Sequence, residues 1–576
     1  RNFLLCGVRS LVYDTYRQVW NELIAEGAPF HIEEIEVRGS SMRVYSNAPT
    51  SLREIWLAST VHDEAEYLVY GEERWTYNKA HRDVASISNW LQQQGVVKGD
   101  RVSIAMRNFP EWLLCYWACV ATGITVVGMN AWWVEDEMEY GLNDAAPKVL
   151  FTDSERLQRF LNISDKFTDL ITVGIRLPET ADGVIPFDNV VTTGGSLPEV
   201  AVDPDSDACI FYTSGTTGYP KGAQLTHRGC VHNVLNLAFA ANLSTLTQCR
   251  LQGVEPPEPE DSPKSAALIT TPLFHVTANN CLAHGTTVGG GKLVHMYRWD
   301  ALEALRLIEQ EKITNITGVP VMSRELISHP DFDRYDTSSL LAVGGGGAQL
   351  QPDLVGKIDS TVANARPGTG YGMTETCGII TSISGDFFLD KAESAGPVMP
   401  TFEAKVVDSN GNTMAQDEAG ELWVRGAPVI KGYINRPDAT AETITDGWLH
   451  TGDIAKIDDQ GFIYIVDRLK DMVLRGGENI YCSEVETCLH KIDNILECSV
   501  FGVPDDRLGE EVGVCIYRDE VSSLSAEDIR QFCTEHMARQ KIPKYIWFNS
   551  EPLPRNANGK FLKRELRDSL DIIEAF

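Results

Sequence analysis

A segment rich in Gly, Ser and Thr at residues 212–222 carries the clearest chemical signal in this chain. It reads Tyr-Thr-Ser-Gly-Thr-Thr-Gly-Tyr-Pro-Lys-Gly and lies between an apolar run typical of a strand and an apolar run typical of a helix. Glycines let successive backbone N–H groups turn toward one anion, hydroxyl groups add donors, and Lys221 adds positive charge. Gly222 stands where a Walker loop has the Ser or Thr that binds magnesium, so this is a different kind of loop. The segment therefore predicts a site for a polyphosphate.

Further segments with residues suited to a nucleotide site follow this loop in order. They are residues 371–375 (Tyr-Gly-Met-Thr-Glu), 448–453 (Trp-Leu-His-Thr-Gly-Asp), 467–471 (Asp-Arg-Leu-Lys-Asp) and 554–560 (Pro-Arg-Asn-Ala-Asn-Gly-Lys). With the loop, they resemble the ordered motifs of the adenylate-forming superfamily, which comprises acyl- and aryl-CoA synthetases, adenylation domains of peptide synthetases and beetle luciferases. The resemblance spans roughly residues 50 to 570, and several ordered motifs are far more specific than one. It favours the acyl-CoA synthetase branch, which includes fatty-acid and 4-coumarate CoA ligases.

The resemblance implies roles for individual residues in binding ATP and Mg²⁺. The residues implied for ATP are Thr213, Ser214, Gly215, Thr216, Thr217, Gly218 and Lys221 at the β- and γ-phosphates, Gly347, Ala348, Gln349 and Tyr371 at adenine, and Asp453 with Arg468 at the ribose. Thr374 would bond to the α-phosphate and Glu375 would hold Mg²⁺, a hard cation that prefers oxygen ligands. A carboxylate that attacks ATP is an anion approaching a polyanion, so catalysis must come mainly from positioning and charge neutralisation.

Two half-reactions need different residues near the reacting carboxyl group. By resemblance, Lys560 would stabilise both the acid and the α-phosphate during acyl-adenylate formation. The thiol of coenzyme A must then reach the same carbonyl, which requires a movement. The resemblance implies that a small C-terminal domain swings about a hinge at Lys470 and presents Gly476 and Gly477. The missing side chains of these glycines would leave room for the pantetheine arm.

The acid itself is the least defined part of the site. His275, within Pro-Leu-Phe-His at residues 272–275, matches a catalytic family position whose aromatic ring gates the acyl pocket. The expected pocket walls, residues 316–322 and 368–372, are apolar or small and carry no charged side chain, which suits a hydrocarbon tail. We expect a medium- or long-chain fatty acid, with an aromatic acid such as a cinnamate as the alternative, because apolar pockets discriminate weakly between similar acids.

The same residues bear on three other functions. A carrier-loading adenylation domain usually has an acidic residue in its pocket and a carrier module after it, and neither is evident here. A luciferase-like oxidation would reuse the same motifs, so it stays open. A catalytically silent acyl-AMP-binding regulator would be expected to lack Lys560 or Glu375, and both are present.

These residues need a large layered scaffold to position them. A chain of 576 residues exceeds what one hydrophobic core usually supports. Apolar runs alternate with helical patterns through most of it, which predicts an α/β fold with strands at residues 209–212, 267–270, 313–317 and 340–343. From about residue 405, hairpin turns predict a β-rich subdomain. We expect an N-terminal extension of unknown role at residues 1–49, an AMP-binding adenylation domain at 50–467 and a small mobile α+β domain at 468–576.

Composition limits the partners and the compartment. Asp and Glu number 81 against 50 Lys and Arg, a net charge of −31 that disfavours nucleic acid and anionic lipid surfaces. The 13 cysteines include no Cys-x-x-Cys pair, which indicates reduced thiols in an intracellular, most simply cytoplasmic, protein without a zinc site. The expected partners are a small carboxylic acid, ATP and coenzyme A. The oligomeric state is not predicted.

Residues 112–134 carry no charge and are long enough to cross a bilayer. Pro110 and Glu111 suit the first turn of a helix, Gly123 suits its end, and residues 124–127 are typical of a buried strand. We therefore predict a core helix followed by a core strand, and no transmembrane span.

Overall fold

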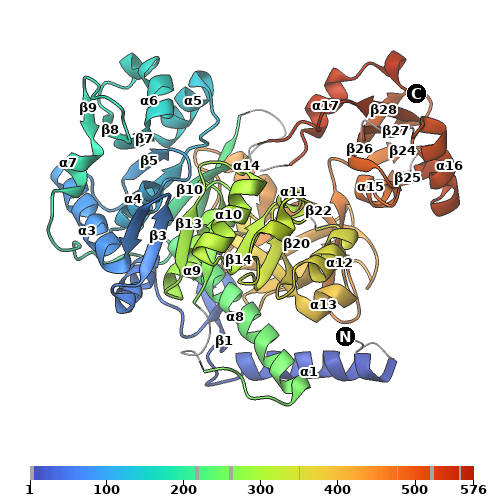
Figure 1. Ribbon diagram of the computed structural model, residues 1–576, viewed down its shortest axis with the longest axis horizontal. Helices are drawn as coiled ribbons and strands as arrows, with labels where there is room; N and C mark the ends of the chain where they lie inside the picture. Colours follow the sequence, from blue (N-terminus) through green and yellow to red (C-terminus); the bar gives the residue numbers. More distant parts are fainter. Residues whose placement is uncertain are drawn as a thin grey trace. The chain divides into compact units, whose positions relative to one another are not determined.

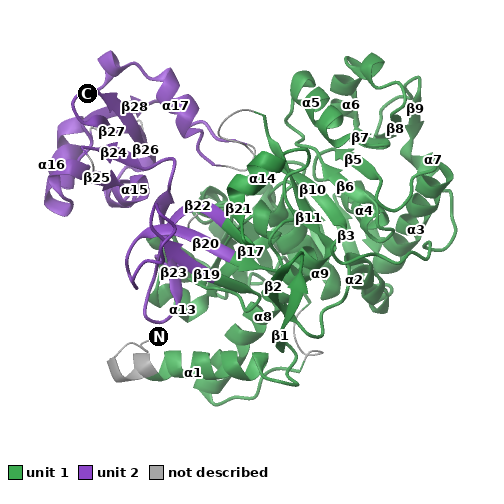
Figure 2. Ribbon diagram, turned by 180° about the vertical axis from the view of Figure 1, so that it is seen from behind, with its two compact units in different colours: residues 1–392, 396–403, 425–449 green, residues 393–395, 404–424, 450–576 purple. Residues whose placement is uncertain are grey.

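The chain has the mixed α/β fold that the sequence predicts. The computed structural model describes residues 6–213, 219–258, 264–348, 350–476, 478–518, 524–556 and 560–576. These residues divide into two compact units (Figure 2). Unit 1 comprises residues 1–392, 396–403 and 425–449, and unit 2 comprises residues 393–395, 404–424 and 450–576.

Unit 1 contains a seven-stranded sheet in the order β11-β10-β6-β5-β7-β8-β9, whose strands are labelled in Figure 2. Its strands are β5 (Arg101–Ala105), β6 (Thr125–Gly128), β7 (Val149–Asp153), β8 (Ile171–Ile175), β9 (Val184–Pro186), β10 (Asp207–Thr213) and β11 (Lys221–Thr226). All neighbours are parallel except β10 and β11. The helices along this part of the chain are α3 (Tyr77–Gln93), α4 (Pro110–Val120), α5 (Glu135–Ala145), α6 (Ser154–Leu161) and α7 (Phe187–Val191).

A second sheet in unit 1 has eight strands in the order β17-β16-β15-β14-β12-β13-β3-β4. They are β3 (Glu66–Tyr70), β4 (Glu73–Thr76), β12 (Ala266–Ile269), β13 (Lys292–His295), β14 (Asn315–Gly318), β15 (Ala342–Gly345), β16 (Arg366–Met373) and β17 (Gly378–Ser384). The helices along this part are α8 (His227–Gln252), α9 (His284–Val288), α10 (Ala301–Glu311), α11 (Pro320–Ile327), α12 (Pro352–Thr361) and α13 (Gly385–Asp390). The four predicted strands overlap β10, β12, β14 and β15.

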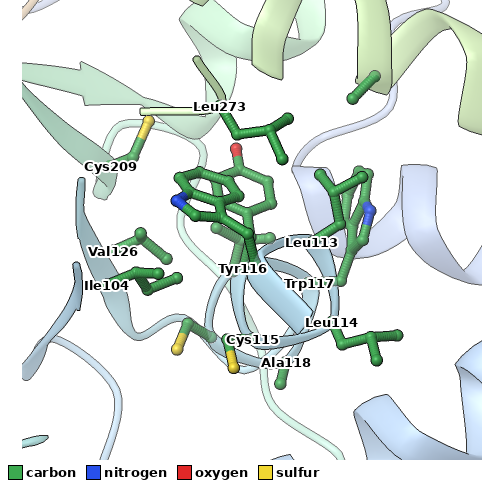
Figure 3. Packing of buried hydrophobic residues seen from close by; sticks show 14 of the residues in the cluster. Ile104, Leu113, Leu114, Cys115, Tyr116, Trp117, Ala118, Val126, Cys209 and Leu273 are labelled. Atoms are coloured by element: carbon green, nitrogen blue, oxygen red, sulfur yellow. The ribbon is translucent and has the colours of Figure 1, made fainter. Parts of the chain in front are cut away.

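Helix α4 forms part of the core of unit 1 (Figure 3). Every residue from Pro110 to Val120 is buried, and Trp112, Tyr116 and Trp117 are fully covered. A helix that is apolar on all sides is stable in water only when neighbours surround it. Gly123 then adopts a φ of +71°, and β6 follows. The predicted helix and strand are confirmed, and within the described residues no helix has the length and hydropathy needed to cross a membrane.

The first fifty residues are packed into unit 1 where the structure describes them. They form α1 (Cys6–Ile24), β1 (Ile32–Val37) and β2 (Ser40–Tyr45), and α1 lies beside α8 (Figure 1). The rings of Trp20 and Phe239 are in contact, with their centroids 4.7 Å apart. Glu22 makes a bidentate ion pair with Arg250 of α8. This segment therefore contributes packing to unit 1, and α2 (Leu52–Ala58) follows it.

Unit 2 begins with β-rich structure and continues into a small α+β body. Most of β19 (Phe402–Val407), β20 (Gly420–Gly426) and β22 (Trp448–Ile457), and all of β23 (Phe462–Arg468), belong to it. β22 and β23 pair antiparallel through a turn that contains Gly461. A five-stranded sheet then contains β24 (Val473–Arg475), β25 (Glu478–Ile480), β26 (Ile495–Asp505), β27 (Gly509–Arg518) and β28 (Tyr545–Asn549), with helices α15 (Cys482–Leu489), α16 (Ala526–His536) and α17 (Lys563–Ser569).

Candidate functional site

The predicted phosphate loop opens from a β-hairpin. Thr213, the last residue of β10, is the antiparallel partner of Lys221, the first residue of β11. Residues 214–218, which hold the predicted Ser214, Gly215, Thr216, Thr217 and Gly218, lie outside the described residues. The sequence places a helix directly after the loop, but β11 intervenes and α8 begins only at His227. Residues 221–226 form a strand because they pair with β10 along their whole length. The same pairing holds Thr213 and Lys221 opposite each other.

A tyrosine that the sequence analysis missed joins two of the predicted residues. The hydroxyl group of Tyr433 donates a hydrogen bond to Glu375 Oε1 at 2.8 Å, and the Lys221 Nζ lies 4.3 Å from the centroid of the Tyr433 ring. Burial, and then the negative charge of Glu375, raise the pKa of Tyr433 far above its ordinary value, so the phenol stays protonated and donates. No local pattern around Tyr433 marks it, because its partners lie far away in the sequence.

Thr374 and Glu375 lie in a fixed turn after β16. The hydroxyl group of Thr376 accepts a hydrogen bond from the Met373 N–H and lies 2.8 Å from the Gly378 carbonyl oxygen. A side chain at position 372 would collide with that same carbonyl group, so only glycine fits at this position. The turn therefore holds Thr374 and Glu375 in one orientation.

The donor set at this turn fits Mg²⁺ bound together with a nucleotide. Glu375 is only 7% exposed, and within the described residues its carboxylate takes part in no ion pair. No group of three or more His, Cys, Asp or Glu side chains that could hold a metal occurs among those residues. Mg²⁺ is commonly bound by one or two carboxylates plus substrate phosphates, so a single buried carboxylate joined through Tyr433 to Lys221 suits it.

Several predicted residues lie at one edge of the eight-stranded sheet. Strands β12, β14, β15 and β16 run parallel. The first three lead into His275, Val319 and Gly347 respectively, and Tyr371 lies in the last part of β16. Carboxyl ends of parallel strands share one edge, which is where ligands bind in open α/β sheets. Ala348 follows Gly347, whose φ of +74° favours glycine, whereas Gln349 lies outside the described residues. Unit 1 thus brings the predicted adenine, metal and acyl residues to a common edge.

The expected acyl-pocket walls lie at the same edge. Ile316 and Val319 are buried, and most of residues 368–372 are half-buried. A side chain at Gly346 would stand 3.6 Å from the Thr277 methyl group and 3.9 Å from the Thr317 methyl group, so glycine there leaves space between these threonines. His275 packs its ring 4.6 Å from that of Phe274. The surfaces that these residues present are methyl groups, backbone and aromatic rings.

A buried amide network, which the sequence analysis missed, supports this edge. The π-helix η3 (Thr277–Ala283) follows His275, and its Asn280 donates to the Cys377 carbonyl group at 2.9 Å. Asn233 of α8 donates to the Asn280 carbonyl group and accepts a hydrogen bond from Ile379 N–H. Buried amides that satisfy one another rigidify their surroundings. The network therefore fastens the segment after His275 to the turn after Glu375.

Unit 2 holds the remaining predicted residues. Asp453 on β22 and Arg468 on β23 are register partners, with 3.6 Å between Asp453 Oδ1 and Arg468 Nε, so antiparallel pairing brings the ribose pair together. Lys470 is exposed. Gly476 adopts a φ of +60° and donates its N–H to the Leu508 carbonyl group at 2.7 Å, and Gly477 lies outside the described residues. Lys560 is half-buried in a hairpin near the end of the chain.

Comparisons with known proteins find matches over most of the chain. The chain matches the family model of AMP-binding enzymes over residues 56–434 and that of the AMP-binding enzyme C-terminal domain over residues 484–560. It is 32% identical over 501 residues to the feruloyl-CoA synthase of Amycolatopsis sp, with 86% of this chain and 94% of that protein covered. It is 31% identical over 542 residues to the mitochondrial medium-chain acyl-CoA ligase ACSF2 of Homo sapiens, with 88% and 85% covered.

Solved structures give the same picture. The o-succinylbenzoate CoA synthetase of Bacillus subtilis, in complex with its acyl-adenylate intermediate, is 26% identical with a TM-score of 0.74, with 90% of this chain and 98% of that chain covered. ATP-bound MatB from Rhodopseudomonas palustris is 26% identical with a TM-score of 0.77, with 89% and 98% covered.

Proposed function

Because the chain belongs to the family of AMP-binding enzymes, we propose that it joins a medium- or long-chain fatty acid to coenzyme A and converts ATP into AMP and pyrophosphate. It is an acid–thiol ligase of the AMP-forming type. The observation that carries the proposal is the coupling of Lys221, Tyr433 and Glu375 at the sheet edge where His275 and Tyr371 also lie.

In the first half-reaction the fatty-acid carboxylate attacks the α-phosphorus of ATP, and pyrophosphate leaves. Lys221 and the loop before it would hold the β- and γ-phosphates, and Thr374 would bond to the α-phosphate. Mg²⁺ bound by Glu375 would supply positive charge that offsets the charge on the phosphates. Tyr433 would keep the Glu375 carboxylate oriented through its 2.8 Å hydrogen bond.

Lys560 would serve the same half-reaction from unit 2. Its ammonium group would contact both the attacking carboxylate and the α-phosphate, and so would stabilise the charge that shifts between them. Asp453 would accept hydrogen bonds from the ribose hydroxyl groups, with Arg468 assisting. These roles need both units at one nucleotide.

In the second half-reaction the thiol of coenzyme A attacks the acyl-adenylate carbonyl group, and AMP leaves. The pantetheine arm would pass along Gly476 and Gly477 after a rotation about Lys470. The N–H group of Gly476 bonds to the Leu508 carbonyl group, which fixes the backbone beside that path.

One observation favours a fatty acid. Within the described part of the expected pocket walls, residues 316–322 and 368–372, no side chain is ionisable except the Tyr371 phenol. A carrier-loading enzyme for amino acids would be expected to place an acidic group there. The feruloyl-CoA synthase relative keeps the aromatic acid as the alternative.

A panel of acids tests the proposal. AMP release is measured with Mg-ATP and each acid, from hexanoate to palmitate and from cinnamate to ferulate, with and without coenzyme A. We expect the fastest CoA-dependent AMP release with a saturated fatty acid. A preference for ferulate over every fatty acid would establish the aryl alternative, and AMP release that no acid stimulates would refute the ligase itself.

A further inference from the structure

The lysine loop is defined here by residues 553–556 and 560–563, which form the two paired arms of a hairpin around Lys560. Asn556 N–H donates to the Lys560 carbonyl group at 2.9 Å, and Lys560 N–H donates to the Asn556 side-chain oxygen at 3.0 Å. Leu562 N–H donates to the Pro554 carbonyl group at 3.0 Å. These bonds fix the ends of the hairpin to each other, but they do not fix the hairpin to the sheet.

Glu497 on β26 anchors the first arm of the lysine loop. Its Oε2 accepts a hydrogen bond from Leu553 N–H at 2.7 Å, and its Oε1 accepts one from the Arg555 guanidinium group at 2.9 Å. Arg555 in turn lies 3.9 Å from the centroid of the Phe561 ring on the opposite arm. The side chains are largely covered, with 13% of Glu497 and 24% of Arg555 exposed. One carboxylate thus holds both arms, the second through the guanidinium group.

Glu486 on α15 anchors the second arm. The Lys563 ammonium group donates to Glu486 Oε1 at 2.8 Å and to the Val500 carbonyl group at 3.0 Å. Glu486 Oε1 also accepts a hydrogen bond from Val500 N–H. Burial of Lys563 opposes its charge, but neighbouring groups, Glu486 first among them, outweigh burial and raise the pKa of Lys563 above its ordinary value. Lys560 therefore lies between two ion-paired anchors.

We propose that Glu497 is a positioning residue for acyl-adenylate formation, because it holds Arg555 and thereby sets where the Lys560 ammonium group stands. The proposal rests on the proposed function. Both carboxylate oxygens of Glu497 bond to residues of the lysine loop, so Glu497 acts through that loop. Because Lys560 serves the first half-reaction alone, a shift of this loop must slow that half-reaction and leave the second one intact.

A purely structural role for Glu497 predicts a different result. If the ion pair with Arg555 only stabilised the small α+β body of unit 2, its loss would lower the midpoint of thermal unfolding and would impair both half-reactions together. Measuring the two half-reactions separately therefore distinguishes positioning from stability.

The test uses the full chain with Glu497→Gln, which keeps an oxygen for Leu553 N–H and removes the charge that faces Arg555. Adenylation is measured by exchange of labelled pyrophosphate into ATP, and thioester formation is measured from a synthetic acyl-adenylate and coenzyme A. We expect exchange to fall by about tenfold to a hundredfold, since a misplacement of about 1 Å can cost that much. Thioester formation should stay within about twofold of wild type.

A matched control lies on the same strand. Asp505 of β26 pairs with Lys544 at 3.0 Å and is 15% exposed, similar to Glu497. It lies roughly 26 Å from Glu497 along an extended strand. Asp505→Asn removes the charge that faces Lys544 but keeps the side-chain oxygen that accepts a hydrogen bond from Leu508 N–H. It should therefore leave the ratio of the two half-reactions at its wild-type value.

The outcomes separate the two proposals. If Glu497→Gln lowers both half-reactions equally, or leaves exchange unchanged, the positioning role is wrong while the ligase function stands. If wild-type protein exchanges no pyrophosphate with any acid, the function itself fails. Should Glu497→Gln not fold, Arg555→Ala removes the same ion pair from the other side and carries the same expectations.

Discussion

The phenol of Tyr433 and the carboxylate of Glu375 are joined by a 2.8 Å hydrogen bond although 58 residues separate them. The same aromatic ring lies against the Lys221 ammonium group. A residue that no motif includes thus connects the expected metal ligand to the expected phosphate-binding lysine. This relationship makes the orientation of Glu375 testable without removing its charge.

Tyr433→Phe should raise the Mg²⁺ concentration that half-saturates pyrophosphate exchange. The ring and its contact with Lys221 remain, but Glu375 loses a hydrogen bond, and bonds to charged groups contribute about 1.5–3 kcal/mol, or roughly tenfold to a hundredfold. The measurement is exchange rate against Mg²⁺ at saturating ATP. Tyr45→Phe removes another buried phenol hydrogen bond, to Asn236, and should leave this Mg²⁺ dependence unchanged. An unchanged value in Tyr433→Phe would contradict the orienting role.

Lys560→Ala should abolish acyl-adenylate formation and spare the second half-reaction. Removal of a charge that acts in only one transition state slows that step, by about 10²-fold to 10³-fold for comparable electrostatic groups. Pyrophosphate exchange measures the first step, and coenzyme A acylation from a supplied acyl-adenylate measures the second. Equal losses in both steps would be incompatible with the assignment. The control is Arg564→Ala, which removes an exposed positive charge from the adjoining helix α17 and should change neither step.

Gly476→Val should slow thioester formation and leave pyrophosphate exchange near its wild-type rate. A bulky side chain would narrow the path expected for the pantetheine arm, and a residue with φ near +60° also strains any side chain. Gly461→Val controls for that strain, because Gly461 has a φ of +83° with open space around it in the β22–β23 turn. If both variants slow thioester formation equally, strain and not the path explains the effect.

Unit 1 should lose stability below about pH 6.5, the ordinary pKa of histidine. Burial lowers the pKa of His227 and His232 to about 4, and that of His284 and His295 to about 3. As the pH falls from about 6.5 toward these values, the histidines of the unfolded chain become protonated, whereas the buried ones of the folded chain stay neutral. The free energy of unfolding then decreases by about 1.4 kcal/mol per pH unit for each such histidine.

Urea denaturation at pH 7.5, 6.5 and 5.5 measures this loss. Burial raises the pKa of Asp467 in unit 2 to about 6, which works in the opposite direction in the same window. His284→Gln can keep a hydrogen bond with the Tyr116 hydroxyl group, which His284 Nε2 now contacts at 2.9 Å. This variant should reduce the slope of the free energy of unfolding against pH by the contribution of one histidine, about 1.4 kcal/mol per pH unit. Equal free energies of unfolding at pH 7.5 and 5.5 would show that the buried imidazoles do not stay neutral in the folded chain.

The amino-acid sequence by itself determined the features that depend on local pattern. The ordered motifs identified the family, since each needs particular residue types at short spacing. The α4 helix followed by β6 could be predicted because Pro110 and Gly123 mark the helix ends and the apolar run is too long for a single strand. The alternation of strands and helices indicated the α/β class for the same reason, because periodicity is a property of neighbours in the chain.

Only the tertiary structure decided which distant groups meet. Tyr433 reaches Glu375, Asn233 reaches Asn280, and Glu497 reaches Arg555 because packed sheets and helices bring segments together whose sequences carry no mark of one another. The strand β11 after the phosphate loop was missed because it gains its hydrogen bonds from β10, and the packing of α1 on α8 depends likewise on contacts far along the chain. Hydrogen bonds and apolar contacts between distant segments form only in the folded chain, so their partners cannot be read from local spacing.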